Sequence, residues 1–262
     1  MAMEDAEFDI PLLHRPDAGP HSFEQEFECS AERYGWGVMP DHGIDLAIID
    51  QASSIIRVDR PSTSRHPNLQ AWNPGDAITH LSLALDKLAD ILLAAIARFL
   101  WLEPDWFVEP TRGRSSALHL VTPGNTAAGG SRFLPADDLG APVGLFTLTL
   151  APTDVVLDVV GRGGIRRRIT LRSGTLLLTM GGMLQRLTND VLPATSYRVI
   201  NPGESSDAGA AEVLRFSVPF RDDYLIRTLP ECGLGTARDL YPVPVLAGDL
   251  RSSRANDTEI SR

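Results

Sequence analysis

"GLFTLTLAPTDVVLDVVGRGGIRRRITLRSGTLLLTM", residues 144–180, contains four short apolar runs separated by glycine, proline, serine and aspartate. Runs of this length that are rich in β-branched residues and bounded by turn residues are typical of β-strands. Similar runs lie on either side of this stretch: "ALHLVTP" before it, and "SYRVINP" and "EVLRFSVPF" after it. Seven short strands with tight turns predict a sandwich or a jelly roll.

The N-terminal part of the chain mixes helical and strand patterns. Segment 22–34 and the run "DLAIIDQASSII" carry apolar residues at helical spacing, and "GWGVMPDHGI" between them is typical of a strand and turn. Between residues 81 and 99 apolar residues recur every three or four positions, which predicts one long helix packed on the sheet. We therefore expect an α+β fold with a double-stranded β-helix (jelly roll) core, an N-terminal α/β segment and a long supporting helix.

The composition of the chain argues against nucleic acids and membranes as binding partners. The formal charge of −10 and a pI of about 5.0 disfavour binding to phosphate backbones, so no nucleic-acid partner is expected. Cys29 and Cys232 are too few for a disulfide framework, and the acidic start of the chain lacks an apolar signal core. The longest apolar run, 91–102, is too short to span a bilayer. We expect a cytoplasmic protein without a membrane partner.

Several motifs occur in an order that resembles a known family. The motifs are "YGWGVMPDHGID" (34–45), "LHLVTPG" (118–124), "GTLLLTMGGMLQRLTND" (174–190), "YRVINP" (197–202) and "LRFSVPF" (214–220). Together they resemble the isopenicillin N synthase-like family of Fe(II) and 2-oxoglutarate-dependent dioxygenases, across nearly the whole chain. The resemblance implies the same jelly-roll core, with a pocket at its mouth.

On this basis we expect one compact unit made of four consecutive parts. These are an N-terminal dioxygenase-like α/β region (1–77), scaffold helices (78–115), the jelly-roll core (116–244) and a flexible tail (245–262).

The chain departs from the family at the iron ligands, which are two histidines and one carboxylate. Without gaps, the family's His-x-Asp pair aligns with Gly140 and Pro142. With a small insertion it aligns with Ala136 and Asp138. Tyr197 stands where the distal histidine is expected. Because both histidines are missing, we expect that neither iron nor 2-oxoglutarate is used and that no metal ligand is present.

The remaining histidines are poor substitutes, because none lies in the second half of the chain. His42 is expected to have a structural role, bonded to the backbone of its turn. His119 alternates with apolar residues on a strand and is expected to pack inside or line the pocket. Asp137 and Asp138 could offer a carboxylate, but a solvated turn is the favoured interpretation.

Part of the family's 2-oxoglutarate site is retained. Arg215 and Ser217 match the Arg-x-Ser that holds the far carboxylate, and an arginine fork with a hydroxyl is a good carboxylate receptor. Thr122 and Leu120 replace the companion tyrosine and asparagine. We expect Arg215, Ser217, Thr122 and His119 to bind the substrate. A structural arginine held by backbone carbonyls is the alternative for Arg215.

Three functional hypotheses follow. The first is a metal-free enzyme of natural product biosynthesis that carries out a cyclisation, elimination, isomerisation or rearrangement of a small specialised metabolite, such as a carboxylic acid. In this enzyme Tyr197 acts as hydrogen-bond donor or general acid; alternatively, Tyr197 only fills the vacated metal site. The second is a non-catalytic ligand-binding protein. The third is an oxidoreductase with atypical iron ligands. The oligomeric state is left open.

Overall fold

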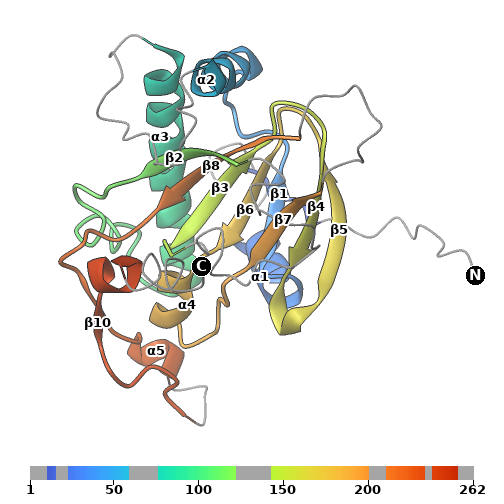
Figure 1. Ribbon diagram of the computed structural model, residues 1–262. Helices are drawn as coiled ribbons and strands as arrows, with labels where there is room; N and C mark the ends of the chain where they lie inside the picture. The colour runs from blue at the N-terminus through green and yellow to red at the C-terminus, as the bar shows by residue number, and fades with distance from the viewer. Residues whose placement is uncertain are drawn as a thin grey trace, which may run out of the picture.

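The computed structural model describes residues 11–15, 23–58, 76–121, 143–200, 211–233 and 238–252. Eight strands form two antiparallel sheets (Figure 1). The strands are β1 (Trp36–Met39), β2 (Ala117–Val121), β3 (Phe146–Leu150), β4 (Val155–Val160), β5 (Arg166–Leu171), β6 (Leu176–Met180), β7 (Ser196–Ile200) and β8 (Val213–Val218). The major sheet has the order β1-β6-β3-β8-β2, and the minor sheet has the order β5-β4-β7. All seven strands expected after residue 116 are present, and the predicted jelly-roll class is confirmed.

Three helices support the major sheet: α1 (Phe23–Arg33), α2 (Leu46–Val58) and α3 (Ala77–Phe99). The Asp76 side chain caps α3 by accepting a hydrogen bond from the Thr79 backbone N–H at 2.9 Å. Figure 1 shows α3 along the side of the major sheet that faces away from β4 and β5. Its apolar stripe buries leucines and alanines in the larger of two hydrophobic cores. The long helix predicted from residues 81–99 is therefore confirmed.

The strands of the major sheet separate two environments, because successive side chains point to opposite faces. One face contributes to the core that also contains α3. Its central residues are Phe146, Leu148, Leu150, Leu176, Leu178, Leu214, Phe216 and Val218, and each is at most 1 % exposed. The other face looks toward the minor sheet.

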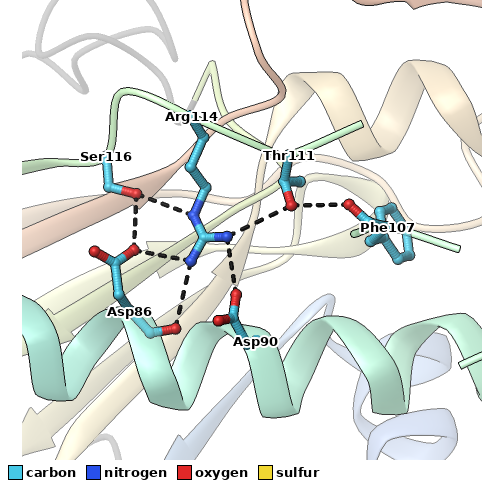
Figure 2. Close-up of polar contacts among 6 residues, drawn as sticks. All are labelled: Asp86, Asp90, Phe107, Thr111, Arg114 and Ser116. Carbon is cyan, nitrogen blue, oxygen red and sulfur yellow. Dashed lines mark hydrogen bonds and ion pairs between the residues drawn. The ribbon is translucent and has the colours of Figure 1, made fainter. Parts of the chain in front are cut away.

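Arg114 ties α3 to the segment that leads into β2 (Figure 2). Its guanidinium donates to Asp86 at 2.8 Å and lies 2.9 Å from Asp90, one turn further along the helix. Its Nε also donates to the Ser116 hydroxyl at 3.2 Å, and the Thr111 hydroxyl lies 3.5 Å from Nη1. The Arg114 side chain is 12 % exposed, so this network fixes the start of β2 against the helix.

The C-terminal part is more ordered than the sequence indicated. β9 (Leu225–Ile226) pairs with β10 (Val245–Leu246), and a helical turn follows at 247–252. This differs from the flexible tail expected from residue 245; pairing with β9 holds its first residues, and residues 253–262 lie outside the described part. Two short helices, α4 (Gly182–Leu187) and α5 (Pro230–Gly233), and a 3-10 turn, η2 (Arg162–Gly164), complete the elements. No helix in the described ranges is long and apolar enough to cross a membrane.

Candidate functional site

Two rows of side chains cross the inner face of the major sheet. The register aligns Trp36, Thr179, Thr147, Ser217 and Ala117 in the first row. It aligns Val38, Leu177, Thr149, Arg215 and His119 in the second. We call Thr179, Thr147 and Ser217 the hydroxyl row, and Thr149, Arg215 and His119 the arginine row. Polar side chains are thus concentrated on β8 and β3, in the middle of the sheet.

Both rows lie between the two sheets. The apolar members Trp36, Val38 and Leu177 belong to a second core, separate from the one that contains α3. That core also contains the inner residues of the minor sheet, which are Val155, Leu157, Val159, Ile169 and Leu171, with Tyr197 and Val199 packed against it. The polar rows therefore face the interior of the jelly roll.

Tyr197 connects the two sheets. It lies on β7 of the minor sheet, and its hydroxyl is 2.9 Å from the Thr149 hydroxyl on β3 of the major sheet. Burial raises the pKa of Tyr197, while the positive charge of Arg215 and the hydrogen bond with Thr149 lower it by less. The phenol is therefore protonated at neutral pH and can donate a hydrogen bond.

Arg215 and His119 are direct cross-strand neighbours on β8 and β2. Opposite residues in an antiparallel pair have Cβ atoms about 4.5–5.5 Å apart, so both side chains serve the same part of the interior. The structure thus brings Tyr197, Arg215, Ser217 and His119 to the inner side of the barrel. The fifth expected residue, Thr122, lies outside the described residues.

Sequence reasoning missed the threonines of the inner face. Thr147, Thr149 and Thr179 are each 0 % exposed. The signal was present in "FTLTL" and "LLLTM", where threonine interrupts otherwise apolar strands at positions of one parity. Which face that parity belongs to becomes clear only from the pairing with β8.

His42 has the structural role expected for it. It is 3 % exposed, its Nε2 lies 2.8 Å from the Gly174 carbonyl, and its Nδ1 accepts from the Ile44 backbone N–H at 3.1 Å. Burial lowers the pKa of His42, although the hydrogen bond to Gly174 acts in the opposite direction. This histidine joins the turn after β1 to the loop before β6.

A separate charged cluster lies on the outer face of the minor sheet. Asp158, 1 % exposed, accepts hydrogen bonds from Arg166, Arg168 and Arg198 on the two neighbouring strands. Burial by itself would raise the pKa of Asp158, but the three arginines lower it below its usual value. Because these strands alternate, the cluster points away from the barrel interior and stabilises the sheet.

The family that the sequence resembles binds 2-oxoglutarate and iron, and the described residues suit the first better than the second. Arg215, Ser217 and the neighbouring threonine hydroxyls offer the donors that a carboxylate requires. For iron, no group of three His, Cys, Asp or Glu side chains comes together within the described ranges. Asp137 and Asp138 belong to segment 122–142, which lies outside those ranges and has no histidine in its sequence. The donor set therefore fits 2-oxoglutarate and does not, as far as it is described, fit iron.

Solved structures with the same fold are informative about the cofactors. A protein assigned to the 2OG-Fe(II) oxygenase family from Caulobacter crescentus is 26% identical, with a TM-score of 0.73 over 95% of this chain and 98% of that chain. A full-length Neurospora crassa protein in complex with alpha-KG and thymine is 14% identical, with a TM-score of 0.70 over 95% and 97%. JOX2 in complex with 2OG, Fe and JA is 16% identical, with a TM-score of 0.65 over 92% and 83%. No family model and no curated protein matches the sequence.

These structures correct one expectation. Because the two ligand histidines are missing from the sequence, neither 2-oxoglutarate nor iron was expected to be used. That expectation is wrong: solved structures of the same fold hold these groups, alpha-KG in the Neurospora crassa protein and both 2OG and Fe in JOX2.

The resemblance first seen in scattered motifs extends to the whole described architecture, from β1 to β8 and the helix that supports them. The chain therefore shares the fold of the 2OG-Fe(II) oxygenase family.

Proposed function

We propose that this protein is an enzyme that binds 2-oxoglutarate, or an acid closely similar to it, inside the jelly roll, and that Arg215 holds a carboxylate of this ligand. The observation that carries the proposal is the arginine row with Ser217 beside it on the same strand, facing the barrel interior. A guanidinium and a hydroxyl side by side bind a carboxylate through charge-assisted hydrogen bonds.

The surroundings of Arg215 favour an anionic ligand. His119 and Thr149 are its cross-strand neighbours, and Thr147 is the neighbour of Ser217 on β3. Removing water from this region strengthens the attraction between a guanidinium and a carboxylate, because the effective dielectric constant falls. The solved relatives that contain 2OG or alpha-KG support this choice of ligand.

We further propose that Tyr197 acts as hydrogen-bond donor or general acid toward the metabolite that is converted. Its raised pKa keeps the phenol protonated, and Thr149 fixes the direction of its hydroxyl. Cyclisation, elimination, isomerisation and rearrangement of a small specialised metabolite all benefit from a fixed proton donor. The part assigned to this chain is binding, orientation and proton donation.

The proposal is tested by calorimetric titration of the protein with 2-oxoglutarate, anaerobically, with and without Fe(II). Arg215→Met should raise Kd by roughly 30-fold or more, and Arg215→Lys by less, because lysine keeps the charge and loses the fork. Arg221→Met is the matched control, since Arg221 lies beyond the end of β8 and bonds to Glu109 and Asp223. It should bind 2-oxoglutarate like the wild type.

Tyr197→Phe separates catalysis from binding in the same assay. It should bind 2-oxoglutarate normally and lower conversion of candidate metabolites, followed by mass spectrometry, by roughly 100-fold or more. Normal conversion would mean that Tyr197 only fills space. If Arg215→Met binds 2-oxoglutarate normally and merely melts earlier, the arginine is structural and the proposed function fails.

A further inference from the structure

Two buried hydroxyl groups inside the barrel have no hydrogen-bond partner within the described ranges. The Oγ1 atoms of Thr147 and Thr179 make no hydrogen bond to any part of the chain that the structure describes, and both residues are 0 % exposed. The two threonines are direct cross-strand neighbours on β3 and β6, and Ser217 follows on β8. The unpartnered groups are therefore adjacent members of one row.

Packing alone does not account for threonine at both positions. Burying a hydroxyl without a partner is unfavourable, because its hydrogen bonds to water are lost and not replaced. Valine has nearly the same shape and suits a strand as well. Thr149, on the same face of β3, shows the usual solution, since its hydroxyl bonds to Tyr197. The hydroxyls of Thr147 and Thr179, which have no such partner among the described residues, are available to bond to a ligand.

We infer that Thr147 and Thr179 are ligand-binding residues, whose hydroxyls continue the site of Arg215 and Ser217 toward β1 and bind oxygen atoms of the bound acid. The inference rests on the proposed function for the position of that acid, and adds the contacts that determine which acid is bound. Arg215 lies in the adjacent row, so its charge favours ligand oxygens that carry negative charge along the hydroxyl row.

The length of the row defines the class of ligand. Neighbouring strands are about 4.8 Å apart, so Thr179 lies about 10 Å across the sheet from Ser217, with Thr147 between them. An acid that contacts the row needs a second polar group beyond the carboxylate held by Arg215. Dicarboxylic, keto and hydroxy acids meet this requirement, whereas an acid with a plain hydrocarbon chain does not.

The test compares three probes, 2-oxoglutarate, malate and valerate, by calorimetric titration of wild type, Thr147→Val, Thr179→Val and Thr147→Ser. Each valine variant should weaken binding of 2-oxoglutarate by about tenfold or more, and Thr147→Ser should restore it. Binding of valerate should not change. Free of ligand, both valine variants should melt at a higher temperature than the wild type, because an unpaired hydroxyl has been removed.

Ser82→Ala is the matched control. The Ser82 hydroxyl is also buried without a partner among the described residues, but it lies on α3, outside the barrel. This variant should bind all three probes like the wild type. A loss of affinity in Ser82→Ala equal to that in Thr147→Val would show a general effect of hydroxyl removal and overturn the inference.

The remaining outcomes distinguish the two proposals. If Arg215→Met loses 2-oxoglutarate while both valine variants bind it normally, the hydroxyls hold ordered water only; the inference fails and the proposed function stands. A second outcome is that the wild type binds malate but not 2-oxoglutarate, with a lower affinity for malate in the valine variants. In that case the choice of 2-oxoglutarate as ligand fails, and the inference that the hydroxyl row binds the acid stands. If the wild type binds none of the probes, both proposals are overturned.

Discussion

The two faces of the major sheet are built from the same strands but hold different kinds of residue. On the side of α3, β3 and β8 present only large apolar groups such as Leu148 and Phe216. On the barrel side the same strands present Thr147, Arg215 and Ser217. One step along the chain changes a residue of the scaffold into a residue of the candidate site. Stability and binding should therefore respond to different substitutions, even at adjacent positions.

The largest effect is expected for Phe216→Ala. Phe216 is 0 % exposed in the core with α3, so its truncation leaves a cavity and should lower the free energy of unfolding by about 3–5 kcal/mol. The adjacent Ser217→Ala, on the barrel side, should cost about 1 kcal/mol or less. Urea unfolding of both variants measures the difference. Equal losses would contradict the division between the two faces.

Arg114→Met sharpens the comparison, because it removes an arginine from the scaffold side. Its bonds to Asp86 and Asp90 hold α3 against the start of β2, but both carboxylates are partly exposed (Figure 2). We expect a loss of about 1–3 kcal/mol in the free energy of unfolding, with no change in Kd for 2-oxoglutarate. If Arg114→Met loses as much affinity for 2-oxoglutarate as Arg215→Met does, the binding site depends on how β2 is held against α3, and the two faces are not independent.

The smallest effect is expected at His42, which belongs to neither face. Its pKa in the folded protein is lowered, mainly by burial, with Arg15 lowering it further and Asp41 raising it. The unfolded chain therefore takes up a proton first as the pH falls below about 6.5. This contribution to stability is complete above that pH and is lost as the pH falls toward the lower pKa of the folded state, by at most about 1.4 kcal/mol per pH unit. Melting curves of wild type and His42→Gln test this, since the variant should lack that step.

Much of the fold could be predicted, because its signals are local. Short apolar runs bounded by turn residues marked the strands, and the spacing of leucines marked α3. Arg215 and Ser217 were found because motif order fixed their place on β8. The threonines were not, since a lone threonine in an apolar strand has no meaning until the neighbouring strands show which face it occupies. The link from Tyr197 to Thr149 joins different sheets, so no spacing along the chain predicts it.

The error about cofactors has a different cause. The expectation that neither cofactor is used rested on the histidines missing from the aligned positions. Missing iron ligands say nothing about the separate residues that bind 2-oxoglutarate. Arg215 and Ser217 were already present as contrary indications in the same sequence.

The strand order of the major sheet also determines when the protein can fold during its synthesis. Within the major sheet of the described chain, β1 pairs with β6 and β2 pairs with β8, so each early strand waits for a strand partner made much later. α3 is complete before β3, β6 and β8 have been translated, and until then the apolar stripe that it buries against them is open to water. Such non-local pairing slows folding and lengthens the time for which the nascent chain is prone to aggregate. A ribosome-bound chain that ends before Val213 should therefore be a substrate for chaperones.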